Sequence, residues 1–242
     1  MRKKAIIRVL NVRNILIFLL VYMLLFLVSE KGDSIVEIYG GFSVSHLSGL
    51  HVFRIMKWAL CVLPPIAVSV LFMEEELGTC VIYTVIRTKS IRQWWGIHWL
   101  GVLTVNLLYV VSVTAISALQ GINRKMCSKD FILFFVIFGI HILSVSVLSV
   151  LILFVCKSLK MSVLFFGIVE IALVAAGSIS PGLSAYLYPF WGMVKNKNFL
   201  LHTFRAHLMI TISISAGLVM LCVLYTLRRS NGEGIAAYVK SR

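Results

Sequence analysis

The stretch Phe131–Cys156 reads FILFFVIFGIHILSVSVLSVLILFVC and contains no Asp, Glu, Lys or Arg. A helix needs about 20 apolar residues to cross the hydrocarbon core of a membrane. Five further stretches approach this pattern: Asn14–Ser29, Met56–Met73, Trp95–Leu119, Met161–Ile179 and Leu208–Leu227. Backbone polar groups inside lipid must be satisfied within one segment, so helices are the expected form. The sequence therefore predicts an all-α integral membrane protein with six transmembrane helices.

Composition also favours lipid as the environment of most of the chain. Hydrophobic residues make up 60% of the 242 residues and charged residues only 13%, and the mean hydropathy is +0.98. Soluble domains carry about 25% charged residues. No hydrophilic block is long enough for a soluble domain, so residues 1–242 are predicted to form a single transmembrane domain.

The net charge of +14 could indicate nucleic-acid binding, but its distribution argues against that partner. Lys and Arg lie in short clusters between the apolar stretches, without a zinc-finger or RNP-like motif. Such clusters anchor helix ends at an anionic lipid leaflet. Their positions favour a multi-pass protein of the cytoplasmic membrane with both termini cytoplasmic. Ser29-Glu30-Lys31-Gly32-Asp33 offers no signal-peptide cleavage site, so the first helix is expected to stay uncleaved.

Cysteine and histidine patterns do not predict a metal site. The five cysteines include no C-x-x-C pair, and the histidines show no H-E-x-x-H spacing. We expect the cysteines to act as small apolar residues that pack between helices.

The segment Glu74–Arg92, between the second and third apolar stretches, is ordered by charge. Its acids come first and its bases last, and they include Glu74, Glu75, Glu76, Arg87 and Arg92. Carboxylates are favourable at the N-terminal end of a helix dipole and cations at its C-terminal end. Leu77, Val81 and Val85 fall on one stripe at helical spacing. The segment is therefore predicted to be a short amphipathic helix at the inner membrane surface.

This segment resembles part of a known family, the permease subunits of type-2 ABC exporters. In that family a short helix between spans two and three has acidic residues, Gly-Thr, an apolar stretch and then a basic residue. Glu75-Glu76-Leu77-Gly78-Thr79, followed by Arg87 and Arg92, stands in those positions here. The resemblance implies that these residues and Glu74 couple the chain to a cytosolic ABC ATPase subunit.

The last external loop extends the resemblance. Ser180-Pro181-Gly182 and Tyr186-Leu187-Tyr188-Pro189-Phe190-Trp191 look like the family's re-entrant hairpin between spans five and six. The chain has no G-x-x-x-x-G-K-[ST] phosphate loop, so ATP and Mg²⁺ are expected on the partner ATPase, and this chain is not expected to be an enzyme. One six-helix unit is half of a pathway in the family, which implies a homodimer or a heterodimer with a second permease.

Three polar residues fall within the apolar stretches: Glu170, His141 and Asn106. A charged group at the centre of a membrane helix costs about 2.5–3.5 kcal/mol on insertion scales. Glu170 is therefore expected to face the bundle interior, on a helix face that it shares with Gly167 and Gly177. Its role is either that of a translocation-path or proton-relay carboxylate or that of a protonated acid hydrogen-bonded to a neighbouring helix. His141 and Asn106 are expected to join helices, with a place in the translocation path as the alternative.

These features predict the membrane-spanning subunit of an ATP-driven exporter of a small amphipathic substrate, such as a drug, a lipid-like molecule or an antimicrobial peptide. One alternative is a proton-coupled secondary transporter that uses Glu170 and His141; such folds contain interrupted helices, and Pro64-Pro65 is expected to interrupt span two. An intramembrane hydrolase would have to bring Glu75-Glu76 to His46, which is expected on the opposite side of the membrane. An immunity-type accessory membrane protein without transport activity is a further alternative.

Overall fold

The computed structural model describes residues 12–28, 41, 52–79, 91–119, 128–156, 158–184 and 186–193, together with residues 217 and 220. These residues form five long helices and then two short ones: α2 (Val12–Val28), α4 (Val52–Thr79), α6 (Ile91–Leu119), α7 (Ser128–Cys156), α8 (Leu159–Ile179), α9 (Pro181–Ser184) and α10 (Tyr188–Trp191). Within these ranges there is no β-strand, which agrees with the all-α prediction.

Four of the helices are long and apolar enough to cross a membrane. Their apolar segments are Val52–Glu76, Gly96–Val113, Phe134–Leu153 and Leu159–Ile179, which coincide with predicted spans two to five. The corresponding part of α2, Asn14–Leu24, is shorter. The predicted span Leu208–Leu227 lies outside the described residues apart from two positions. The described part is thus compatible with a multi-pass membrane protein.

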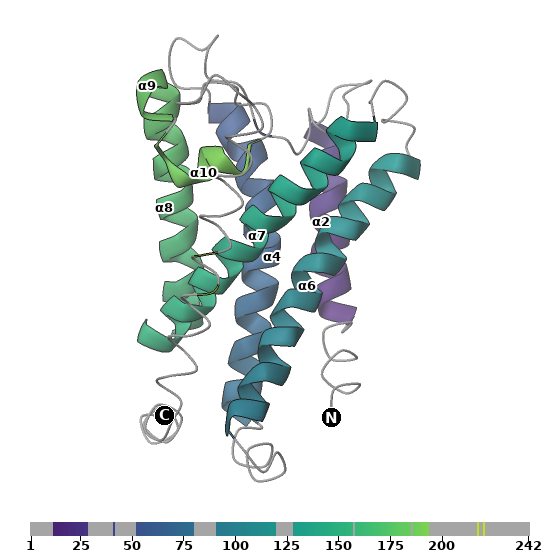
Figure 1. Cartoon of the computed structure of the whole chain (residues 1–242), viewed down its shortest axis with the longest axis vertical. Helices are drawn as coiled ribbons and strands as arrows, with labels where there is room; N and C mark the ends of the chain where they lie inside the picture. Colours follow the sequence, from purple (N-terminus) through teal and green to yellow (C-terminus); the bar gives the residue numbers. More distant parts are fainter. Residues whose placement is uncertain are drawn as a thin grey trace.

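Helix α4 lies at the centre of the bundle. It packs against α2, α6, α7 and α8. In Figure 1, α7 crosses α4, while α8 lies on one side of α4 and α6 and α2 lie on the other. Val62, Ile66 and Phe138 are among the fully buried side chains between these helices. Large apolar side chains such as Leu107 and Ile168 are exposed on the outer faces, as expected where lipid replaces water as the solvent.

The Pro64-Pro65 pair does not interrupt α4, contrary to the expectation from the sequence, because the helix continues through both prolines to Thr79. Proline at position 65 has no N–H, so the carbonyl oxygen of Cys61, four residues earlier, lacks its helical donor. The Tyr109 hydroxyl of α6 donates to that oxygen over 2.6 Å. A neighbouring helix therefore supplies the missing hydrogen bond, which is how membrane helices accommodate proline.

Helix α4 also continues beyond the predicted end of span two. Glu74–Thr79 extends the same helix, so the predicted separate amphipathic helix does not begin at Glu74. No proline or glycine follows Met73 before Gly78, and the intervening Glu and Leu residues are strong helix formers. Residues 80–90, including Arg87, lie outside the described residues, and α6 then begins at Ile91.

Candidate functional site

Helix α8 carries the strongest candidate residue on its buried face. Ser158 caps the start of the helix by accepting from the Met161 N–H, and the buried residues then recur at helical spacing, among them Gly167, Glu170, Val174 and Gly177. Glu170 is 2% exposed. The prediction that Glu170 faces the interior with Gly167 and Gly177 is confirmed.

The Glu170 carboxyl group joins three helices. Trp58 of α4 donates its indole N–H to Oε1 over 3.2 Å. The Nε2 atom of His141, on α7, lies 3.1 Å from the same oxygen. His141 is 1% exposed. We call Trp58, His141 and Glu170 the Glu170 cluster.

Aromatic rings surround the Glu170 cluster and exclude water from it. Trp58 contacts the rings of Phe138 and His141, with centroid separations of 6.2 Å and 5.6 Å, and Tyr188 of α10 lies 5.0 Å from His141. A buried carboxyl group in such surroundings is costly unless it is hydrogen-bonded. The distance between His141 and Glu170 fits a proton on either partner, so the pair can hold a proton within the bundle.

Close packing at glycines places the helices around the cluster. A Cβ atom at Gly167 would lie 2.9 Å from the side chain of Leu63 of α4, so α8 packs closely on α4 at this glycine. A side chain at Gly177 would collide with Phe190, and one at Gly192 would collide with His141. The segment after α8 therefore folds back so that α10 packs against both α7 and α8, and Figure 1 shows α10 beside α8.

A second buried acid–histidine pair joins the end of α4 to the start of α6. Glu76 Oε2 lies 3.0 Å from His98 Nε2, and each residue is 4% exposed. In the same run of acids Glu74 is half-buried and Glu75 is exposed. The three consecutive glutamates, which sequence reasoning treated as one group, thus have different surroundings.

Asn106 of α6 joins three helices away from the Glu170 cluster. Its amide group donates to the Ser69 hydroxyl of α4 over 3.2 Å, and its carbonyl oxygen accepts from the Ser146 hydroxyl of α7 over 2.8 Å. Its amide also donates to Val102 O within α6 over 2.8 Å. Asn106 therefore has the role of an interhelical link that the sequence predicts, and it is separate from the Glu170 cluster.

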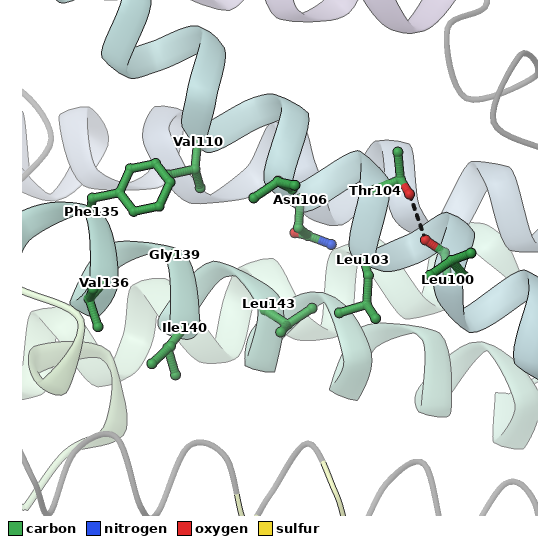
Figure 2. Close-up of a pocket in the computed structure, with 11 residues that line it drawn as sticks. Leu100, Leu103, Thr104, Asn106, Val110, Phe135, Val136, Gly139, Ile140 and Leu143 are labelled. Atoms are coloured by element: carbon green, nitrogen blue, oxygen red, sulfur yellow. Dashed lines mark hydrogen bonds between the residues drawn. The ribbon is translucent and has the colours of Figure 1, made fainter. Parts of the chain in front are cut away.

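A pocket of about 510 Å³ lies between α6 and α7. Its lining is apolar apart from Thr104 and Asn106, and Figure 2 shows leucine, valine and isoleucine side chains around it. Thr104 donates its hydroxyl to Leu100 O over 2.8 Å, and the Asn106 amide is already hydrogen-bonded. The pocket therefore offers apolar surface and suits an alkyl group better than a polar ligand.

The structure brings together some of the predicted site residues and leaves others unplaced. Glu170 meets His141, whereas Leu77, Gly78 and Thr79 form the end of α4. Arg92 lies in the first turn of α6, Arg87 falls outside the described residues, and so does His46. Among the residues that the structure describes, no group of three or more His, Cys, Asp or Glu side chains is placed to share a metal ion.

Sequence reasoning did not single out Trp58 or His98. Trp58 stands near the start of its apolar stretch, where a tryptophan is typical of the membrane interface. His98 stands near the start of the next helix, at a position that antiparallel pairing of α4 and α6 brings level with Glu76. Glu76 stands three residues before the end of α4 and His98 seven residues after the start of α6, so their spacing from the intervening loop gave no signal of the pairing.

Comparison with protein-family models, curated proteins and solved structures found no match to this chain. Its own contacts are therefore the basis for inferring its function.

Proposed function

We propose that this chain is the membrane-spanning permease subunit of an ATP-driven ABC exporter of the cytoplasmic membrane. A separate cytosolic ATPase subunit binds ATP and Mg²⁺, and a second permease, identical or related, completes the pathway. The substrate is a small amphipathic molecule, because the chain has no long hydrophilic segment that could form a large external binding domain.

The observation that carries this proposal is the path of the chain after α8. A re-entrant hairpin is expected between spans five and six of such a permease. In this chain α9 packs on α8, α10 packs on both α8 and α7, and Gly192 lies against His141, near the middle of α7. A segment that returns to the middle of a membrane helix supports a hairpin that enters the bilayer.

The position of α4 supports a mechanism for energy coupling. Its acidic end, with Glu75 exposed, is predicted to lie on the cytoplasmic side, where an ATPase would bind. Because α4 contacts α2, α6, α7 and α8, a displacement of that end reaches most of the described bundle. Closure of the ATPase would then shift the bundle between inward-open and outward-open states.

Co-purification tests the proposal directly. The tagged chain is purified in mild detergent from its native membrane, and bound protein is assayed for ATP hydrolysis. We expect a stoichiometric ATPase with the wild type and with Lys160→Glu, a charge reversal on the predicted cytoplasmic side away from α4. The variant Glu74→Lys/Glu75→Lys should lose the ATPase. Transport by the purified chain in vesicles that contain no ATPase would refute the proposal.

A proton-coupled secondary transporter is the second candidate, and the 3.1 Å contact between His141 and Glu170 favours it. A carboxyl group and an imidazole buried together within a membrane bundle are a typical proton-relay arrangement. Vesicles that contain only this chain would then take up substrate in response to a pH gradient. Glu170→Gln should abolish that uptake, and its persistence in Glu170→Gln would remove this candidate.

A further inference from the structure

The three glutamates at the end of α4 point in different directions. Successive residues of a helix are separated by about 100° around its axis, so Glu74, Glu75 and Glu76 cannot share one surface. Glu75 is exposed, whereas Glu76 is 4% exposed. Glu76 shares its face with Phe72, one turn earlier, and Phe72 is also buried.

Two neighbouring contacts fix this face of α4 against α6. Glu76 Oε2 lies 3.0 Å from His98 Nε2. The His98 ring also lies 6.2 Å from the Phe72 ring, measured between centroids. One turn further along α6, a Cβ atom at Gly101 would come within 2.5 Å of Phe72. The polar pair therefore lies directly beside a tightly packed apolar contact between the same two helices.

We propose that Glu76 is a positioning residue rather than an ATPase-docking residue. Its contact with His98 joins the end of α4 to the start of α6, so that these two helix ends move together. A force applied to Glu75 then displaces α4 and α6 as one unit. This inference rests on the proposed function, because it assigns Glu75 and Glu76 different parts in coupling to the ATPase.

The burial of Glu76 distinguishes a positioning role from a docking role. A docking residue has to be accessible to the partner, and the buried side chain of Glu76 is not. A hydrogen bond that involves a charged partner is stronger and more directional than a neutral one, so this pair suits the fixing of one helix end relative to another.

The first experiment separates docking from positioning. Glu76→Ala and Glu75→Lys are each purified with the ATPase, and both ATPase recovery and substrate transport in vesicles are measured. We expect Glu76→Ala to retain the wild-type amount of ATPase but to transport at least 10-fold more slowly per ATP hydrolysed. Glu75→Lys should lose the ATPase itself. If Glu76→Ala loses the ATPase as Glu75→Lys does, or transports at the wild-type rate, the positioning role is wrong.

A charge-swapped variant controls for a general structural defect. Glu76→His/His98→Glu restores an acid–histidine pair with the partners exchanged, and we expect it to recover at least half of the lost transport. Failure of the swap to improve on Glu76→Ala, in protein that remains monodisperse, would count against a specific pair. Where Glu76→Ala does not fold, Glu76→Gln, which keeps a hydrogen-bonding group, takes its place in both measurements.

A thermal-unfolding cycle tests the pair without any ATPase. The free energies of unfolding of Glu76→Ala, His98→Ala and the double variant are compared in detergent. The double variant should be no less stable than the less stable of the two single variants. If the losses of stability of the two single variants add up to that of the double variant, Glu76 and His98 do not interact, and the proposal is wrong. A wild-type chain that recovers no ATPase would instead refute the proposed function, while this cycle still measures the pair.

Discussion

Tyr109→Phe should destabilise the protein more than removal of a tyrosine hydroxyl in a membrane bundle usually does. The Tyr109 hydroxyl donates to Cys61 O over 2.6 Å, and Pro65 lacks the N–H that would donate to that oxygen in an uninterrupted helix. An ordinary interhelical hydrogen bond in a membrane contributes about 0.6 kcal/mol. Removing the donor of a buried carbonyl group costs about 1–3 kcal/mol. We therefore expect Tyr109→Phe to lower the free energy of unfolding by about 1–3 kcal/mol.

Tyr22→Phe is the matched control, since it removes a hydroxyl from the same region of the bundle. The Tyr22 hydroxyl approaches Tyr109 O at 3.3 Å and is hydrogen-bonded to the Ser112 hydroxyl over 2.5 Å. After its removal the Ser112 hydroxyl still donates to Tyr109 O over 2.8 Å. No backbone group loses its last donor, so the expected loss is about 0.6 kcal/mol or less. Equilibrium unfolding in mixed micelles measures both free energies.

The decisive comparison uses Pro65→Ala as a second background. Alanine restores an N–H at position 65, which can donate to Cys61 O within α4. Tyr109→Phe should then cost only the ordinary contribution, giving a coupling free energy of about 1 kcal/mol between the two changes. An equal cost of Tyr109→Phe in both backgrounds would refute the explanation of how α4 accommodates its prolines.

Three further predictions concern the interior of the bundle, each measured by the same unfolding assay. Glu170→Ala leaves the Trp58 indole N–H and the His141 ring without their shared partner, so the free energy of unfolding should fall by about 2–5 kcal/mol. Glu170→Gln keeps an acceptor and should lose less than half of that amount. Equal losses in the two variants would contradict the assigned contacts. Gly192→Ala forces a methyl group into His141 and should cost about 1–3 kcal/mol. Its control Gly182→Ala meets no atom within 4 Å and should change stability by about 0.5 kcal/mol or less. Asn106→Leu leaves the Ser69 and Ser146 hydroxyls without their amide partner and should lower the free energy of unfolding by about 1–3 kcal/mol. Leu107→Val, at an exposed position of the same helix, is the control. If Asn106→Leu costs no more than Leu107→Val, Asn106 does not join the helices.

The parts of the fold that the sequence predicts correctly are those that lipid imposes. Spans two to five follow from apolar length, and the inward orientation of Glu170 follows from the cost of placing a carboxylate in hydrocarbon. Neither argument needs knowledge of which helices are neighbours. Trp58 could not be predicted as the partner of Glu170 because only the packing of α4 against α8 brings the indole N–H to the carboxyl group.

The end of α4 was mispredicted for a physical reason that the structure makes clear. Acidic residues are favourable at the N-terminal end of a helix dipole, so Glu74 was expected to begin a new helix. In the structure Glu74, Glu75 and Glu76 stand near the C-terminal end of α4, where the dipole disfavours them. That effect is about 0.3–1 kcal/mol for an exposed charge. The His98 contact, formed by residues far apart in sequence, offsets it at Glu76.

The contacts of α4 indicate which helices move together. Three hydrogen-bonded links join α4 to α6, from Glu76 to His98, from Ser69 to Asn106 and from Cys61 O to Tyr109. They lie between Cys61 and Glu76 on α4 and between His98 and Tyr109 on α6, and each fixes the position of one helix along the other. Toward α8, the Trp58–Glu170 hydrogen bond lies near the other end of α4, while Leu63 meets Gly167 through an apolar contact. Movement of α4 along α6 would break all three hydrogen bonds, each of which contributes about 0.5–1.5 kcal/mol. In the proposed transport cycle, a displacement of the acidic end of α4 should therefore carry α6 with it, and the change between inward-open and outward-open states should occur between that pair and α8.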